Sequence, residues 1–78
     1  MTLDQLRINQ AANIVAVRGE PAFRRRLMEL GLLPDTPIRR TGAAPLGDPM
    51  TFGVRGAVLA LRKAEASLID VSPPWEST

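Results

Sequence analysis

The sequence of 78 residues contains no cysteine and no histidine. Without cysteine, a disulfide framework, a thiolate zinc site and a thiol nucleophile are excluded. Without histidine, the chain lacks the commonest metal ligand and the usual general base. Ser67 follows Lys63 by four residues, but no oxyanion or orienting element accompanies this pair, and a serine ending a polar turn explains it better than a catalytic dyad. We expect no enzyme activity, no catalytic residue, no cofactor and no resident metal.

Long apolar runs are also missing. The longest, Ala57–Leu61, is far below the roughly 18 residues needed to cross a bilayer. The first five residues lack the basic region and apolar block of a secretory signal. We therefore expect a cytoplasmic protein without direct membrane insertion.

Strong charge and aromatic residues are scarce as well. The net charge is +2, which does not demand a nucleic-acid partner. The aromatic residues are Phe23, Phe52 and Trp75, whereas small nucleic-acid-binding barrels usually expose several stacking aromatics on a strand face. We expect no nucleic-acid partner, and a small basic nucleic-acid-binding barrel is kept as an alternative.

What the sequence does contain is a pattern of short strands interrupted by one helix. Apolar residues make up 45% of the chain, enough for one small core. Strands are predicted over residues 12–17, 38–41, 50–54, 57–61 and 68–71. Arg55-Gly56 is predicted to turn a hairpin, and Gly53 to mark a bulge. Five short strands favour an all-β class with a closed or nearly closed barrel. We expect one domain over residues 1–72 and a disordered tail over 73–78, where consecutive prolines disfavour a strand.

Helical spacing appears between the first two predicted strands. Phe23, Leu27 and Leu30 recur at i, i+4 and i+7, which predicts one core-facing side on a helix from about Pro21 to Leu30. Proline suits the first turn of a helix, and Gly31 suits a left-handed C-terminal cap. Leu3 and Leu6 are predicted to form a small apolar clip before the first strand.

The segment 44–49, Ala-Pro-Leu-Gly-Asp-Pro, is the most unusual part of the sequence. Its two prolines fix φ and remove two backbone donors, and its glycine permits positive φ. These constraints predict a stiff loop between two strands with Leu46 at the tip. Such a tip suits docking to a partner, and the alternative is that Leu46 folds back over the open end of the barrel. Asp48 fits a turn former better than a metal ligand.

The end of the helix is expected to form one composite surface with the 44–49 loop. Met28 lies off the predicted core face and should be partly exposed. Of Leu32 and Leu33, one should pack against the helix end and the other should be accessible. The run Arg24-Arg25-Arg26 is either a solvated helix face, with Arg25 paired to Glu29, or an electrostatic match to an acidic partner or anionic lipid heads.

Several motifs occur together in one order: residues 26–34 (Arg-Leu-Met-Glu-Leu-Gly-Leu-Leu-Pro), residues 44–49, residues 59–63 (Leu-Ala-Leu-Arg-Lys), Ala66, and residues 69–71. In this order and spacing, from about Leu3 to Val71, the chain resembles the FeoA family of small accessory proteins in bacterial ferrous iron uptake. The resemblance implies an SH3-like barrel with the helix inserted between the first two strands. It also implies a partner, the cytosolic GTP-binding region of the FeoB permease.

A regulatory role follows from the resemblance, with the chain recruited to the inner face of the plasma membrane through its partner. Weak self-association is a further expectation. The alternatives are the nucleic-acid-binding barrel and the SH3-like regulatory domain of a metal-dependent repressor, although the chain has no DNA-binding helices. We expect electrostatic contact through Arg24 and Arg25. The residues expected to bind the partner are Met28, Gly31, Leu32, Leu33, Pro34, Pro45, Leu46, Gly47, Asp48 and Pro49.

Overall fold

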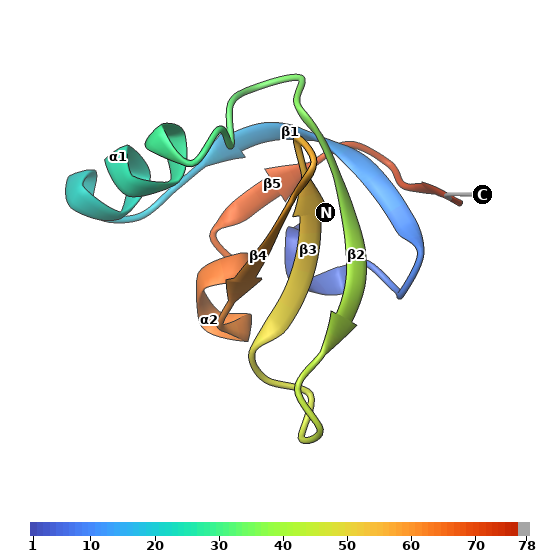
Figure 1. Cartoon of the computed structure of the whole chain (residues 1–78). Helices are drawn as coiled ribbons and strands as arrows, with labels where there is room; N and C mark the ends of the chain where they lie inside the picture. The colour runs from blue at the N-terminus through green and yellow to red at the C-terminus, as the bar shows by residue number, and fades with distance from the viewer. Residues whose placement is uncertain (77–78) are drawn as a thin grey trace.

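The computed structural model describes residues 1–76, and these residues form a strongly curved antiparallel sheet with short helices at its edges (Figure 1). The strands run in the order β4-β3-β2-β1-β5, and β6 pairs with β1. The mostly-β prediction is confirmed, as is a helix between the first two strands. In chain order the elements are the 3₁₀ helix η1 (Leu3–Gln5), β1 (Gln10–Val17), α1 (Pro21–Glu29), β2 (Pro37–Ala43), β3 (Met50–Val54), β4 (Ala57–Leu61), α2 (Lys63–Ala66), β5 (Ile69–Val71) and β6 (Trp75–Glu76).

Two irregularities in strand pairing accompany the curvature of the sheet. The register between β2 and β3 shifts between Arg40 and Gly42, and the register between β1 and β5 shifts between Ile14 and Ala16. An extra residue in one strand bends it and increases its twist. The bulge predicted at Gly53 is wrong, because Gly53 pairs regularly with both neighbouring strands.

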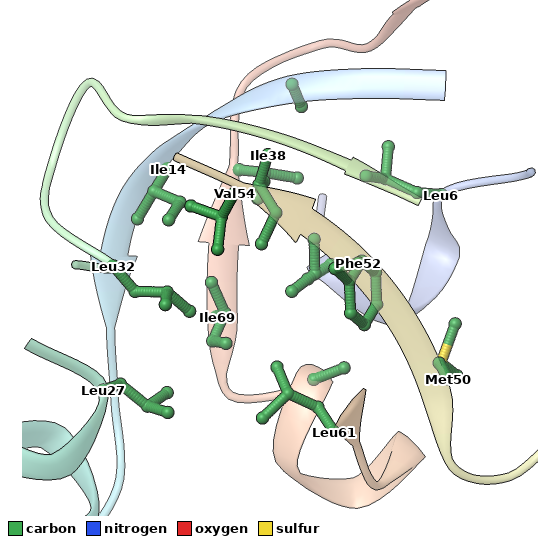
Figure 2. Packing of buried hydrophobic residues seen from close by; sticks show 14 residues of the cluster. Leu6, Ile14, Leu27, Leu32, Ile38, Met50, Phe52, Val54, Leu61 and Ile69 are labelled. Carbon is green, nitrogen blue, oxygen red and sulfur yellow. The ribbon is translucent and has the colours of Figure 1, made fainter. Parts of the chain in front are cut away.

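One apolar core fills the concave side of the sheet (Figure 2). Alternate residues of β3 point into it, so Met50, Phe52 and Val54 are buried. The predicted N-terminal clip is confirmed, since Leu3 and Leu6 are almost completely buried. Because a domain of this size buries a smaller fraction of its surface than a larger one, an apolar segment outside the sheet adds a substantial share of its core.

Helix α1 projects from the sheet, as Figure 1 shows. It contributes one fully buried residue, Leu27, while Phe23 is partly buried against the core. The prediction that Leu30 belongs to this buried side is wrong, because Leu30 is 49% exposed. The helix ends at Glu29 with Leu30 as its C-cap, and Gly31, at φ +96°, turns the chain so that Leu32 enters the core instead.

The predicted hairpin of β3 and β4 is confirmed. Arg55 and Gly56 have φ values of +51° and +79°, as a type I′ turn requires. The C-terminal tail differs from the prediction in its described part, residues 73–76. Trp75 and Glu76 pair with Ala11 and Gln10 of β1. Residues 77–78 of the predicted tail lie outside the described residues.

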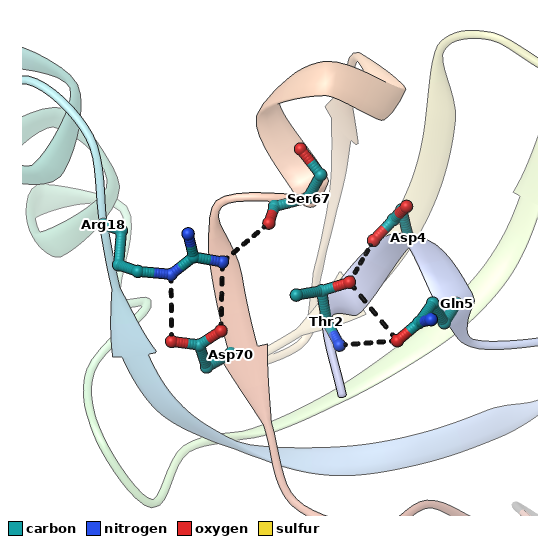
Figure 3. Close-up of polar contacts among 6 residues, drawn as sticks. All are labelled: Thr2, Asp4, Gln5, Arg18, Ser67 and Asp70. Atoms are coloured by element: carbon teal, nitrogen blue, oxygen red, sulfur yellow. Dashed lines mark hydrogen bonds and ion pairs between the residues drawn. The ribbon is translucent and has the colours of Figure 1, made fainter.

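Polar side chains fasten β1 to the segment that ends in β5 (Figure 3). The Arg18 guanidinium donates to both carboxylate oxygens of Asp70 at 3.1 Å and to the Ser67 carbonyl at 2.9 Å. The Thr2 backbone N–H donates to the side-chain oxygen of Gln5 at 2.9 Å. These contacts hold the short elements around the core in place.

Candidate functional site

The loop at 44–49 is closed by its own backbone. The Ala44 N–H donates to the Pro49 carbonyl at 2.9 Å, and the Gly47 N–H donates to the Ala44 carbonyl at 2.7 Å. Leu46, between these contacts, is 97% exposed. The alternative in which Leu46 folds back over the barrel is therefore wrong. The loop holds an apolar side chain fully in solvent.

Asp48 fixes the base of this loop to helix α2. Its carboxylate accepts the backbone N–H of Lys63 at 2.8 Å, at the first residue of a helix where N–H groups lack intrahelical partners. The carboxylate thus has a structural role, but its bond is to the distant helix α2 and not to the neighbouring backbone expected for a turn former. Pro45 and Gly47 remain exposed, and Pro49 is half-buried.

A first groove, with a volume of about 470 Å³, runs along one side of α1. Met28 is 56% exposed and Leu33 is 37% exposed, whereas Leu32 is buried. The prediction that one of the two leucines packs and the other is accessible is confirmed. Leu32 is thus mainly a core residue that borders the groove with little of its own surface. The groove is lined by Val17, Pro21, Arg24, Arg25, Met28, Leu32, Leu33 and Pro34.

The three consecutive arginines of α1 have different surroundings. Arg26 donates to the Glu65 carboxylate at 2.8 Å, and its guanidinium lies 5.5 Å from the centre of the Phe23 ring. Arg24 and Arg25 border the first groove and take part in no ion pair within residues 1–76. The predicted pair of Arg25 with Glu29 is absent there. Two free guanidinium groups thus stand beside an apolar groove.

The carboxylate of Glu65, which Arg26 contacts, has a shifted pKa. The backbone N–H of Arg62 donates to its carboxylate at 2.9 Å, and this contact, followed by the hydrogen bond from Arg26, lowers the pKa of Glu65. Both contacts stabilise the charged carboxylate. The first contact has a partial sequence signal, because an acidic residue three positions after a helix cap is typical of a capping box.

A second groove, of about 380 Å³, lies on the other side of α1, between that helix and β4. Its apolar lining includes Leu30, which is half-exposed for this reason. Pro49 brings the base of the 44–49 loop to the same groove. The residues lining it are Arg26, Leu27, Leu30, Pro49, Leu59, Ala60, Leu61, Arg62 and Glu65.

The structure therefore divides the surface that the sequence suggested as one. Figure 1 shows the tip of the 44–49 loop well away from α1. Met28, Leu33 and Pro34 line the first groove, whereas Pro49 lines the second. Gly31, expected at the contact, is half-buried and lies against the Arg55 side chain, so its role is in the turn. The sequence does not reveal the second groove, because helical periodicity assigns Leu30, one of its lining residues, to the core.

The described residues include neither a metal-binding cluster nor a membrane-spanning helix. Within residues 1–76, no three histidine, cysteine, aspartate or glutamate residues cluster in a way that could hold a metal ion. None of the helices in that range has the length and apolar character needed to span a bilayer.

Comparisons with known proteins agree on one family. Residues 1–73 match the model of the FeoA domain. The chain is 34% identical, over 71 residues, to a fusion of Fe(2+) transport protein A with the Fe(2+) transporter FeoB from Porphyromonas gingivalis. This match takes in 91% of the chain and 8% of the fusion protein, so the chain spans a small part of that relative.

Solved structures give the same result. The FeoA protein of Chlorobium tepidum is 41% identical with a TM-score of 0.86, covering 91% of this chain and 68% of that protein. Stenotrophomonas maltophilia FeoA in complex with zinc, described as a prokaryotic SH3 domain protein, is 32% identical with a TM-score of 0.81, covering 92% of this chain and 89% of the other. The expected SH3-like fold is thus confirmed. A manganese-dependent transcriptional repressor, at 15% identity and a TM-score of 0.78, shares the fold alone.

Proposed function

The chain belongs to the FeoA family, which is associated with ferrous iron transport, and we propose that it is an accessory protein that binds the cytosolic part of a FeoB-type permease. The observation that carries the proposal is the Porphyromonas gingivalis fusion, in which a FeoA-like segment and FeoB belong to one polypeptide. A covalent link keeps two domains at high effective concentration. Without such a link, the affinity has to come from the surfaces that meet.

The exposed apolar side chains suit that task. Leu46 is presented on a closed loop, so it loses little conformational freedom when it binds. Met28 and Leu33 line the first groove beside the unpaired guanidinium groups of Arg24 and Arg25. We assign to Leu46 and to the first groove two separate contacts with the same partner. Apolar anchors supply affinity at such contacts, and nearby charges steer association.

The proposed role is regulatory and non-catalytic, since the chain offers binding surfaces and any GTP hydrolysis belongs to the permease. Recruitment to the inner face of the plasma membrane follows from the partner. The polar contacts described above serve the fold: Asp48 caps α2, and Arg18 joins β1 to β5. The surface left for a partner is mainly apolar with a basic border.

NMR titration of the full chain with the cytosolic GTP-binding region of its cognate FeoB tests the proposal. We expect saturable shifts at Leu46 and at the residues of the first groove. An unrelated GTP-binding domain of similar size serves as the control and should leave those signals unchanged. If the cognate region produces no shift anywhere at a large molar excess, the proposed function is wrong.

A further inference from the structure

The free edge of β4 carries an inference about the form of the partner segment. β4 is the last strand on its side of the sheet and pairs with β3 alone among the described strands. An unpaired edge presents backbone N–H and C=O groups that can template a further strand. Proteins commonly block such edges with charges or proline, but Ala57–Leu61 consists of alanine, valine and leucine.

The register of the hairpin identifies which backbone groups are free. Val54 and Ala57 flank the two-residue turn, and such a closing pair exchanges hydrogen bonds in both directions. Hydrogen-bonded and non-hydrogen-bonded pairs then alternate along an antiparallel ladder. Val58 and Ala60 therefore direct their backbone groups away from β3. Both residues are exposed, Val58 to 74%.

The second groove lies beside this edge and offers space for side chains. Leu59, Ala60 and Leu61 of β4 form one wall, and Leu30, the C-cap of α1, lies opposite. In a strand added to β4, alternate side chains point to one face. Those on the groove side can cover the apolar surface of Leu30 and Leu59, which are only partly buried. The edge and the groove together form a site for an extended segment.

Charge distinguishes between two possible occupants of this site, a second copy of the chain and a partner segment with acidic residues. Arg55 stands at one end of β4, and Arg62 and Lys63 follow its other end, all without an ion pair within the described chain. The nearby carboxylates are engaged, because Glu65 accepts from Arg26 and Asp48 accepts from the Lys63 backbone. Antiparallel pairing with the β4 of a second copy would bring Arg55 of one copy close to Arg62 and Lys63 of the other. Like charges facing each other across strands are destabilising.

We propose that β4 accepts an extended apolar segment with acidic residues at both ends as an added strand. The inference deepens the proposed function and rests on it, because it states how a segment of the FeoB cytosolic region binds. Main-chain hydrogen bonds to Val58 and Ala60 supply affinity, as in other cases of strand addition. Acidic ends meeting Arg55, Arg62 and Lys63 set the specificity.

Hydrogen exchange in the complex with the cognate FeoB region provides the first test. We expect the amide exchange of Val58 and Ala60 to slow markedly on binding, because their N–H groups become hydrogen-bonded. Val58→Pro, which deletes an outward N–H without removing a bond to β3, should weaken binding about tenfold. Val58→Thr keeps the N–H and should change the affinity less than about twofold. Binding with unchanged exchange at both amides overturns the inference while the proposed function stands.

Charge variants supply a measurement that does not depend on the fold of the proline variant. Arg62→Gln combined with Lys63→Gln should weaken binding about fivefold at low salt and less at high salt. An unchanged affinity contradicts the role of charge.

If the FeoB region does not bind at all, the proposed function fails, and two synthetic peptides decide the inference alone. Both peptides have a core of valine and threonine residues. This core is flanked by aspartates in one peptide and by lysines in the other. Preferential protection of Val58 and Ala60 by the aspartate peptide supports the inference, and equal or absent protection overturns it.

Discussion

The guanidinium of Arg26 lies 2.8 Å from the carboxylate of Glu65, and this ion pair connects α1 with α2 across the second groove. The residues are 39 positions apart in the sequence. Because α1 projects from the sheet, this contact joins the helix near its C-terminal end to α2.

Glu65→Gln should destabilise the fold at neutral pH and do so less in acid. The pKa of Glu65 is lowered in the folded chain, chiefly by the backbone N–H of Arg62 and then by Arg26. A group whose pKa falls on folding contributes stability above its unfolded pKa, and loses it as the pH drops through the folded value. Urea unfolding of both proteins at pH 7 and pH 3 measures this difference. A gap of equal size at both pH values would contradict the prediction.

Leu46→Asp should weaken binding to the FeoB region by about tenfold or more, because an apolar anchor is replaced by a charge. Its side chain makes no contribution to the core, so the free energy of unfolding should change by less than about 0.5 kcal/mol. Isothermal titration and thermal unfolding measure the two quantities. Ile8→Asp is the matched control, since Ile8 is 55% exposed and lines neither groove. Equal losses for both variants would remove the special role of the loop.

Gly31→Ala should lower the free energy of unfolding by about 1–2 kcal/mol. The φ of Gly31 is +96°, and a Cβ at this position would lie 2.9 Å from Cδ of Arg55. Gly47→Ala is the control, because Gly47 has φ +88° but open space around it. The smaller loss expected for Gly47→Ala isolates the cost of backbone strain. If Arg55→Ala does not relieve any of the excess at Gly31, the steric part of the explanation is wrong.

The isolated chain should bind no ferrous ion in a tight one-to-one complex. The sequence lacks histidine and cysteine, and residues 1–76 hold no cluster of three metal-ligating side chains. The carboxylates of Asp48, Glu65 and Asp70 already accept hydrogen bonds from neighbouring groups. Anaerobic calorimetry with ferrous salt gives the measurement. Saturable heat at a stoichiometry of one with micromolar or tighter affinity would refute this expectation.

Local chemistry made the turns and strands predictable from the sequence. Glycine at the helix end and in the Arg55-Gly56 turn permits positive φ, and the two prolines of the 44–49 loop fix φ; neither effect depends on distant residues. The alternation of Met50, Phe52 and Val54 likewise determined which face of β3 is buried. The exclusion of a cysteine- or histidine-based site also followed from the residues alone.

Tertiary structure decided which side chains are exposed at the surface. Periodicity placed Leu30 on the buried side of its helix, but α1 projects from the sheet, so that side faces a groove at its last turn. Strand pairing recruited Trp75 and Glu76, because the edge of β1 beyond β5 was free to accept them. The partners of Arg26 and Asp48 lie in α2, at positions that no local pattern relates to them. The sequence by itself thus determined the turns, the strand faces and the kinds of chemistry excluded, because these depend on neighbouring residues. Only the packing of distant elements decided which apolar and charged groups remain open to a partner.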